Sequence, residues 1–451
     1  MKKIASILKN KEIMNRILFT ILILFIFRIG AQITVPGVTL DQEKIGTFLD
    51  GNNALSLMNI LGGGTLQTFS IFALGVSPYI TAQIIIQLLS TDVLPALSDL
   101  RRQGQYGRKK IELATRYLCL MIGAVQAYGI IKTMENSELV TFETGQYAWL
   151  TYIYVVIVQL AGSMTVMWLG DRISVKGIGN GISMIIFAGI VSSLPLQISN
   201  AFSSWVLASR GEGDAALIKG SFQFILYVVS FLLIIAFVVF IELSKRKIPV
   251  QHSGKGGGQT QSMARASFLP IKINSAGVIP VIFASSIMMA PSVIVAFVGG
   301  NTDAEWLNVF ASNKMTNMGG WSMPWGLIIY LALTIAFTFF YSNIQINPQQ
   351  LAENFQKSGS YIPGIKPGNE TERYVRKVLN RVTFLGAISL AIIAALPPVL
   401  TLTVFKDNPS LALGGTGLII VVGVALELNS QIDGLLAGKS FDEVVASGGQ
   451  Q

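Results

Sequence analysis

Few side chains in this 451-residue chain have the type and spacing that catalysis needs. The one histidine, His252, lies in a polar stretch and the one cysteine, Cys119, in an apolar one, which leaves no Ser/His pair within an apolar segment and no internal disulfide. The sequence also has no GxxxxGK[ST] phosphate loop and no Cys/His cluster with metal-ligand spacing. We therefore expect a protein that is not an enzyme and uses no cofactor or metal.

Apolar branched side chains, in contrast, recur at a regular spacing. Three pairs and one single position lie near the middle of long apolar runs: Val76 and Ile80, Ile182 and Ile186, Val278 and Ile282, and Ile420. Residues four apart share one face of a helix. A ring of such side chains can exclude water and ions from a closed opening, although an isoleucine in an apolar helix more commonly faces lipid or core.

The elements that must position these residues are predicted membrane helices. Hydrophobic residues make up 51% of the chain and charged residues 13%, which is too little polar surface to cover a soluble protein of this length. Apolar runs of about 20 residues, long enough to cross a bilayer as helices, recur throughout. They lie near 17–36, 68–90, 113–131, 147–169, 179–198, 220–243, 273–298, 323–343, 382–404 and 412–429. We predict an all-α membrane protein with ten transmembrane helices.

The formal net charge of +9 is unevenly distributed. Most Lys and Arg fall in the N-terminal segment, alternate loops and the C-terminus, a pattern that predicts a multi-pass protein with both termini cytoplasmic. No cleavable signal peptide is recognisable. The spans are almost free of the ionisable groups that ion-coupled transporters place near mid-bilayer. Arg28 lies deepest, and we expect it to be an anchor or a helix-packing contact.

Two apolar runs repeat one another. GVSPYITAQII (75–85) and GVIPVIFASSI (277–287) share G-V-x-P-x-I-x-A-x-x-I, and five spans separate equivalents, so the copies must cross in opposite directions. Unless the match is a coincidence of apolar sequence, it predicts two inverted five-helix halves, 1–200 and 217–451, joined by a connection at 201–216, which the family resemblance described below makes a hinge. Pro78 and Pro280 lack a backbone N–H and are expected to kink these helices.

The stretch ALSLMNILGGGTL (54–66) begins an apolar phase and stops at three consecutive glycines. A helix this short cannot cross hydrocarbon, and irregular backbone at membrane depth requires surrounding protein or water. The stretch is therefore either a re-entrant helix or an amphipathic helix that lies on the outer surface.

Several segments resemble the SecY/Sec61-alpha family of protein-conducting channels. They are FRIGAQITVPG (27–37), FSIFALGVSPYITAQIIIQLL (69–89), GRKKIELATRY (107–117), GIGNGISMIIFAGIV (177–191), LPIKINSAGVIPVIFASS (269–286), NPQQLAENFQKSGSYIPGIKPG (347–368) and GGTGLIIVVGVALE (414–427). The matches run in family order over nearly the whole chain and include polar loops as well as spans.

The resemblance implies a channel in the bacterial plasma (inner) membrane. Unfolded secretory polypeptides would pass through its centre, while signal sequences and membrane segments would leave into the lipid bilayer between the second and seventh spans. The implied pore ring is Ile80, Ile182, Ile186, Ile282 and Ile420, flanked by Val76 and Val278. Residues 54–66 would form a plug, with Leu57, Met58, Ile60, Leu61, Gly62, Gly63 and Gly64 as its central residues.

The resemblance also implies a lateral gate and docking surfaces. The gate would comprise Pro78, Thr81, Gln83, Gln126, Pro280, Ser285 and Ser286, whose polar groups either hold the gate shut by hydrogen bonds or satisfy backbone only. Two basic loops, 244–272 and 345–381, would bind the SecA motor ATPase and the ribosome. The implied docking residues are Lys245, Arg246, Lys247, Lys255, Lys357, Lys366, Arg373, Arg376 and Lys377.

Two departures from the family concern these loops. Lys366 stands where the family usually has Arg, which weakens a bidentate contact. The tract HSGKGGGQTQSMARASF (252–268) is less basic than expected. Other implied partners are SecE-type and SecG-type small membrane subunits, with no specific nucleic-acid sequence.

Two other functions remain open from the sequence. A secondary transporter with inverted repeats would explain the repeat, but not the scarcity of charge at mid-span or the two long basic loops. A membrane insertase or scaffold without a through-pore would not need a plug.

Overall fold

The computed structural model of the protein describes thirteen stretches of the chain. They are residues 10–41, 44–45, 58–59, 62–90, 94–136, 138–142, 148–208, 214–252, 267–298, 305–310, 315–318, 321–403 and 415–448. Helices dominate these stretches, as the sequence predicts.

The described helices account for all ten predicted spans. Eight are long and apolar enough to cross a membrane. They lie within α2 (Lys11–Gly30), α7 (Gln105–Asn136), α8 (Ala148–Lys176), α9 (Gly181–Phe202), α10 (Asp214–Leu243), α12 (Trp325–Gln345), α14 (Asn369–Thr403) and α15 (Gly415–Gly448). The second and seventh predicted spans correspond to α5 (Ser77–Leu89) and α11 (Ile279–Val298), each of which contains a shorter apolar helix.

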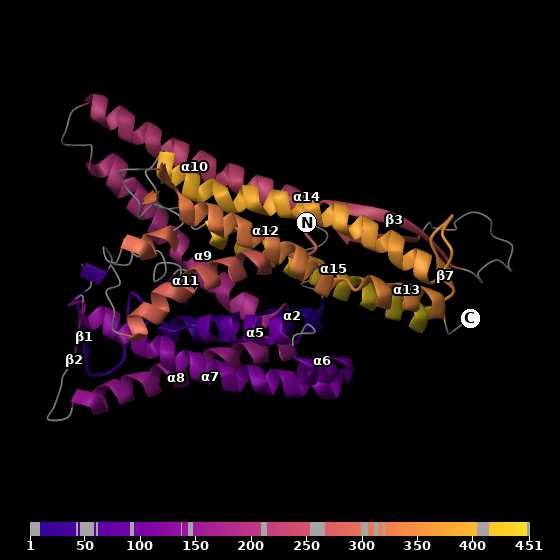
Figure 1. Ribbon diagram of the computed structural model, residues 1–451, viewed down its shortest axis with the longest axis horizontal. Coiled ribbons are helices and arrows are strands. Elements are labelled where there is room, and N and C mark those ends of the chain that lie inside the picture. The colour runs from indigo at the N-terminus through magenta and orange to yellow at the C-terminus, as the bar shows by residue number, and fades with distance from the viewer. Residues whose placement is uncertain are drawn as a thin grey trace.

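Two layers of helices make up the bundle (Figure 1). The violet helices α2, α5, α7 and α8 form one layer, and α10, α12, α14 and α15 form the other. α11 crosses between the layers and packs on α7, while α9 packs on α15. α5 leads toward the end of the bundle that carries α6 (Pro95–Arg102), whereas α11 leads away from that end, so the two repeated segments run in opposite directions.

The predicted start of the second span is wrong. Residues 65–76 form turns rather than helix, and α5 begins only at Ser77. Leu66, Phe69 and Leu74 in this stretch are almost completely buried, which explains its apolar composition without a helix. Phe69 and Gly75 have φ angles of +41° and +53°, which an α-helix cannot accommodate.

The predicted kinks at Pro78 and Pro280 are also wrong. Each proline lies in the first turn of its helix, where the missing N–H would have no intrahelical partner in any case. Gly75 and Gly277, three residues before each proline, have φ angles of +53° and +65°. The repeated G-V-x-P motif therefore encodes the same local structure twice, a left-handed glycine followed by the start of a helix.

The connection between the halves is more helical than the sequence predicts. α9 continues beyond Phe202 as a π-helical turn, Ser203–Leu207, and α10 begins at Asp214. Trp205 of that turn is buried and packs edge-on against Tyr227 of α10, with ring centroids 5.5 Å apart. Burial of an aromatic side chain keeps this part of the predicted polar connection in helical form.

Short antiparallel strands lie at both ends of the bundle. At one end β1 (Val38–Leu40) pairs with β2 (Val140–Phe142), and β5 (Thr316–Met318) pairs with β6 (Trp321–Met323). At the other end β3 (Lys245–His252) pairs with both β4 (Ser267–Lys272) and β7 (Ser360–Tyr361). We call this second end, with α6 and α13 (Pro348–Lys357), the loop end of the bundle.

The hairpin at the loop end has its own apolar core. Ile248 of β3 and Ile271 of β4 are buried in one cluster with Val375 and Leu379 of α14. The alternate residues of the strand, Lys245 and Lys247 among them, are exposed. Burial of Ile248 and Ile271 thus fixes the hairpin on α14, and the basic residues at the start of β3 remain exposed.

Candidate pore and gate

All seven predicted ring residues meet in a single apolar cluster. Five are buried, with side chains 1–9% exposed, and two are partly buried at its edge. The buried members are Val76, Ile80, Ile186, Ile282 and Ile420, and the edge members are Ile182 and Val278. They come from α5, α9, α11 and α15 and the residues just before α5 and α11, so both halves of the chain contribute.

The helices that carry the ring are free of charge at this level. α5, α9 and α11 contain no Asp, Glu, Lys, Arg or His, and Glu427, the first charged residue of α15, lies about two turns beyond Ile420. The cluster can therefore exclude water and ions but offers no group for proton relay or cation coordination.

Local sequence sets the position of two parts of the ring. The Asn180 side chain accepts hydrogen bonds from the backbone N–H groups of Ile182 and Ser183, which fixes the start of α9 one turn before Ile186. On α15, Gly423 leaves room for Val278, whose Cγ1 would lie 3.1 Å from a Cβ at position 423. The small residue lets α15 approach the start of α11 closely.

The described part of the predicted plug lies inside the protein. Met58, Gly62 and Gly63 are buried, and Met58 belongs to a cluster with Ile131 of α7 and Val155 of α8. Leu57, Ile60 and Leu61 lie outside the described residues. A segment that is buried against several helices agrees with a re-entrant segment rather than an amphipathic helix on the surface.

The glycines of this segment end its helix. The N–H of Gly64 donates to the carbonyl of Asn59 at 2.8 Å, and Gly63 has a φ angle of +75°. This is the Schellman arrangement, in which a left-handed glycine follows the last helical residue. Gly63 also contacts α9, because a Cβ at position 63 would lie 2.5 Å from the Cα of Gly189.

Two of the polar residues of the predicted gate bond within their own helices. The hydroxyls of Thr81 and Ser285 donate to carbonyls of their own helices, Ser77 and Ile282, at 3.1 and 2.8 Å. Gln83 is exposed on α5, and Ser286 is partly buried on α11. Of the two roles left open for these groups, Thr81 and Ser285 show the second, because each hydroxyl bonds to a carbonyl in the preceding turn of its own helix.

Gln126 of α7 is the exception among the gate residues. Its side chain is 8% exposed, and its Oε1 has no hydrogen-bond partner among the described residues. We predict that Gln126→Leu raises the melting temperature of the purified protein, because a buried unpaired acceptor costs about 1–3 kcal/mol. Gln83→Leu, on an exposed face, is the matched control and should change nothing. A lower melting temperature for Gln126→Leu would contradict this interpretation.

Sequence reasoning missed an aromatic group beside the ring. Phe283 of α11 packs edge-on against Phe337 and Tyr341 of α12, with ring centroids 5.8 and 6.2 Å away. Tyr341 also forms a side-chain hydrogen bond with Gln87 of α5, which links the two halves across the seam. The spacing of Phe337 and Tyr341, four residues apart, is the only sign of this contact in the sequence.

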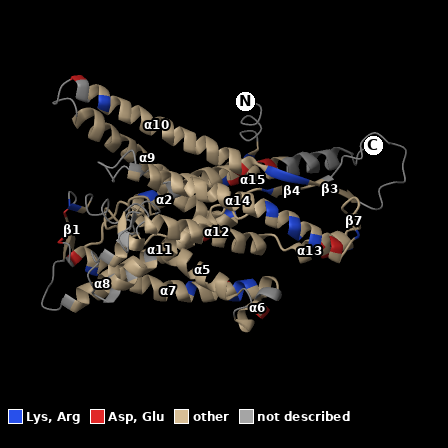
Figure 2. Ribbon diagram, turned by 45° about the horizontal axis from the view of Figure 1, so that its top comes forward, with Lys and Arg blue, Asp and Glu red and all other residues tan. Residues whose placement is uncertain are grey.

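The predicted docking residues that the structure describes are exposed at the loop end. Lys245, Arg246 and Lys247 lie on β3, and Lys357, Lys366, Arg373, Arg376 and Lys377 lie on or between α13 and α14. Lys255 is outside the described residues. Basic residues mark this end in Figure 2 along the strands, the adjoining part of α14 and the start of α7.

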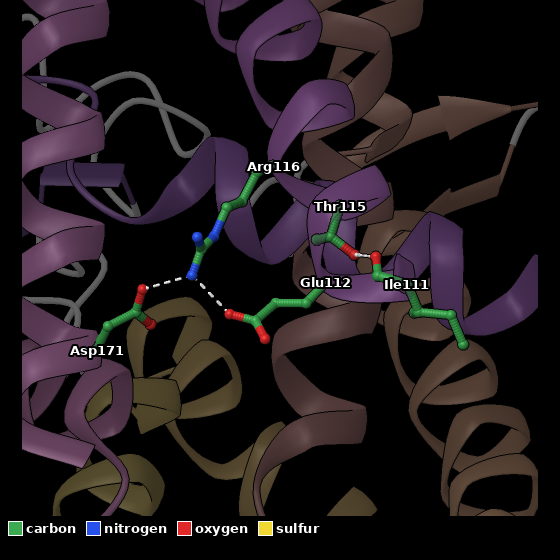
Figure 3. Close-up of polar contacts among 5 residues, drawn as sticks. All are labelled: Ile111, Glu112, Thr115, Arg116 and Asp171. Carbon is green, nitrogen blue, oxygen red and sulfur yellow. Dashed lines mark hydrogen bonds and ion pairs between the residues drawn. The ribbon is translucent and has the colours of Figure 1, made fainter. Parts of the chain in front are cut away.

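One ion-pair cluster joins α7 to α8 near the loop end (Figure 3). Arg116 donates to Glu112 at 2.6 Å and to Asp171 at 2.9 Å, and all three side chains are partly exposed. The glutamate is on the same helix as the arginine, whereas the aspartate is on the neighbouring one. The cluster fixes two helices of one half and has no contact with the ring, so we regard it as structural.

The chain is similar to one family in sequence and in fold. The family model described as SecY matches residues 70–429. The protein translocase subunit SecY of Mycoplasma capricolum is 42% identical over 447 residues, which cover 98% of this chain and 91% of that protein.

Two solved channel structures share the fold. One, described as the structure of a protein conducting channel, has a TM-score of 0.62 and 18% identity, covering 94% of this chain and 92% of its own. The other is Sec61 in the canine ribosome-channel complex from the endoplasmic reticulum, with a TM-score of 0.60, 18% identity and the same coverages.

Proposed function

The chain belongs to the SecY family and is the central pore subunit of a protein-conducting channel, not an enzyme, and from this premise we propose how its parts seal and open the channel. The convergence of seven apolar ring residues from both halves in one uncharged cluster supports the proposal most. A channel for polypeptides of any sequence gains from a wall without specific hydrogen-bonding groups, and branched apolar side chains supply one. An ion-coupled transporter is not favoured, because α5, α9 and α11 carry no charged residue.

We propose that residues 54–66 plug the outer side of the ring in the resting channel. The Gly63–Gly189 contact and the burial of Met58 support this role. An incoming polypeptide would displace the plug and pass through the ring, whose side chains close around it. Such a seal limits ion leakage without binding any one substrate.

Lateral release is proposed to occur between α5 and α11. Because Leu, Ile or Phe favours the bilayer centre by roughly 0.3–0.6 kcal/mol per residue and Arg or Asp disfavours it by about 2.5–3.5, an open seam sorts segments by hydrophobicity. The Gln87–Tyr341 hydrogen bond, which joins α5 to α12, would have to break for the seam to open.

The loop end is proposed to face the cytoplasm of a bacterium and to bind the partners that drive transport. Its exposed basic residues suit acidic or RNA-rich partners, for which we propose the SecA motor ATPase and the ribosome. The similar canine structure is a ribosome-channel complex, which supports a ribosomal partner. We further propose that SecE-type and SecG-type membrane subunits complete the channel and that both termini are cytoplasmic.

Reconstitution tests the proposed function. The chain is placed in liposomes with a SecE-type subunit, SecA and ATP, and protease protection of a secretory precursor is measured. We expect ATP-dependent protection of the precursor. Uptake of small solutes without precursor protection would contradict the proposal and favour a transporter.

Charge reversal tests the docking surface. We expect Lys366→Glu with Lys377→Glu to reduce SecA-driven translocation by about tenfold, or about 1.4 kcal/mol, because unlike charges across the interface become like charges. Lys219→Glu, an exposed change near the start of α10 at the opposite end, is the matched control and should keep normal activity. An equal loss of translocation in Lys219→Glu would show that the effect does not depend on where the charge is reversed.

A further inference from the structure

Arg28 is the one arginine within the apolar part of α2, and its partner is unusual. The Nη1 atom donates to the backbone carbonyl of Gly63 at 2.5 Å, and the contact is partly buried. Among the described residues, no carboxylate lies within ion-pair distance of Arg28. A charged side chain within a membrane segment is costly unless it finds a partner, so a specific acceptor is expected.

The acceptor belongs to the turn that ends the plug helix. Gly63 is the left-handed residue of the Schellman arrangement described above, and the carbonyl groups at a helix C-terminus lack intrahelical partners. A cation next to a helix C-terminus is also favoured by the helix dipole. The guanidinium group therefore fits the end of this helix in both hydrogen bonding and charge.

Other contacts with the end of α2 hold a later part of the chain. The Thr68 hydroxyl donates to the carbonyl of Ala31 at 3.0 Å, and Ile71 N–H donates to the carbonyl of Ile33 at 2.9 Å. These bonds fix the turns at 65–76, which precede α5. Arg28 instead reaches Gly63, within the glycine turn. That turn also contacts Gly189 of α9, and the carbonyl of Gly64 accepts from the Thr68 N–H at 3.3 Å.

We propose that Arg28 is a positioning residue that holds the plug in the resting channel and whose bond to Gly63 breaks when the channel opens. This inference rests on the proposed plug role of residues 54–66. The bond ties α2 to the C-terminal turn of the plug helix, so its loss shifts the plug from its seated toward its displaced position. The rest of the fold keeps its own hydrogen bonds at 65–76.

The test compares the ion conductance of idle channels in planar bilayers. We expect Arg28→Met to raise the conductance by about fivefold, which corresponds to about 1 kcal/mol. Arg28→Lys keeps the charge and a donor and should restore most of the seal. Arg16→Met is the matched control, because it makes the same change on the same helix. Within the part of the chain that the structure describes, the Arg16 side chain pairs with exposed Glu12 alone, at 3.1 Å, so this variant should not leak.

A deletion of residues 54–66 separates this inference from the plug proposal. If the deletion does not leak, the plug role itself is wrong. If the deletion leaks and Arg28→Met does not, only the Arg28 inference fails. We expect both to leak, and Arg28→Met to add no further conductance in the deletion background. If Arg28→Met increased the conductance of the deletion variant further, Arg28 would act through general packing of the bundle, and the inference would be overturned.

Discussion

Idle channels that carry Ile186→Ser with Ile282→Ser should conduct ions at least about tenfold better than the parent channel, equivalent to about 1.4 kcal/mol in the barrier. Both side chains are buried in the ring cluster, one from each half of the chain. Serine is smaller and binds water, so it both widens the constriction and removes the apolar lining that keeps it dry. The double change should exceed either single change, because the remaining ring residues can partly refill a single gap.

The matched control for the ring is Ile157→Ser on α8. This isoleucine is 59% exposed on the outside of the bundle, so the change has the same chemistry without touching the cluster. Conductance in a planar bilayer is the measurement, with the melting temperature of each variant as a check on folding. Unchanged conductance in the double variant, with a folded protein, would mean that the cluster is core packing and not a seal.

Gly63→Ala should also open the resting channel, by several-fold to about tenfold in conductance. The alanine Cβ would lie 2.5 Å from the Cα of Gly189, a backbone atom that cannot move aside without moving α9. The plug must therefore leave its seat. Exposure of the segment to added protease should increase in parallel with conductance.

Gly64→Ala provides an unusually close control for this change. Gly63 and Gly64 have similar φ angles, +75° and +87°, so alanine at either position bears the same kind of left-handed strain of about 1–2 kcal/mol. Nothing lies within 4 Å of a Cβ at position 64. Leakage in Gly63→Ala alone would identify the contact with α9 as the cause, whereas equal leakage in both would point to backbone strain and contradict seating on α9.

Spacing proposed candidates for the ring, and the resemblance to the SecY family selected the ring residues from them. Positions such as Ile186 and Ile282 are branched and apolar, and they lie one turn from a second branched residue in an uncharged helix. Burial in the structure follows the same pattern. The glycine run at 62–64 was also informative, since few other residues tolerate the left-handed turn that ends the plug helix.

Other features could not be predicted, for physical reasons. Hydropathy indicates burial and not backbone form, so the buried turns around Leu66 and Phe69 resembled the start of a span. Pro78 begins a helix rather than kinking one, and this depends on where Gly75 breaks the chain. The link between Gln87 and Tyr341 joins residues far apart in sequence, and only the packing of α5 near α12 brings them together.

The central claim is that a translocating polypeptide passes through the ring of apolar side chains. The most direct measurement places a photoreactive amino acid at position 80, 186, 282 or 420 and arrests a precursor in the reconstituted channel. We predict crosslinks to the precursor from all four positions and none from position 157 on the outer face of α8. Crosslinks from position 157 with none from the four ring positions would contradict the account.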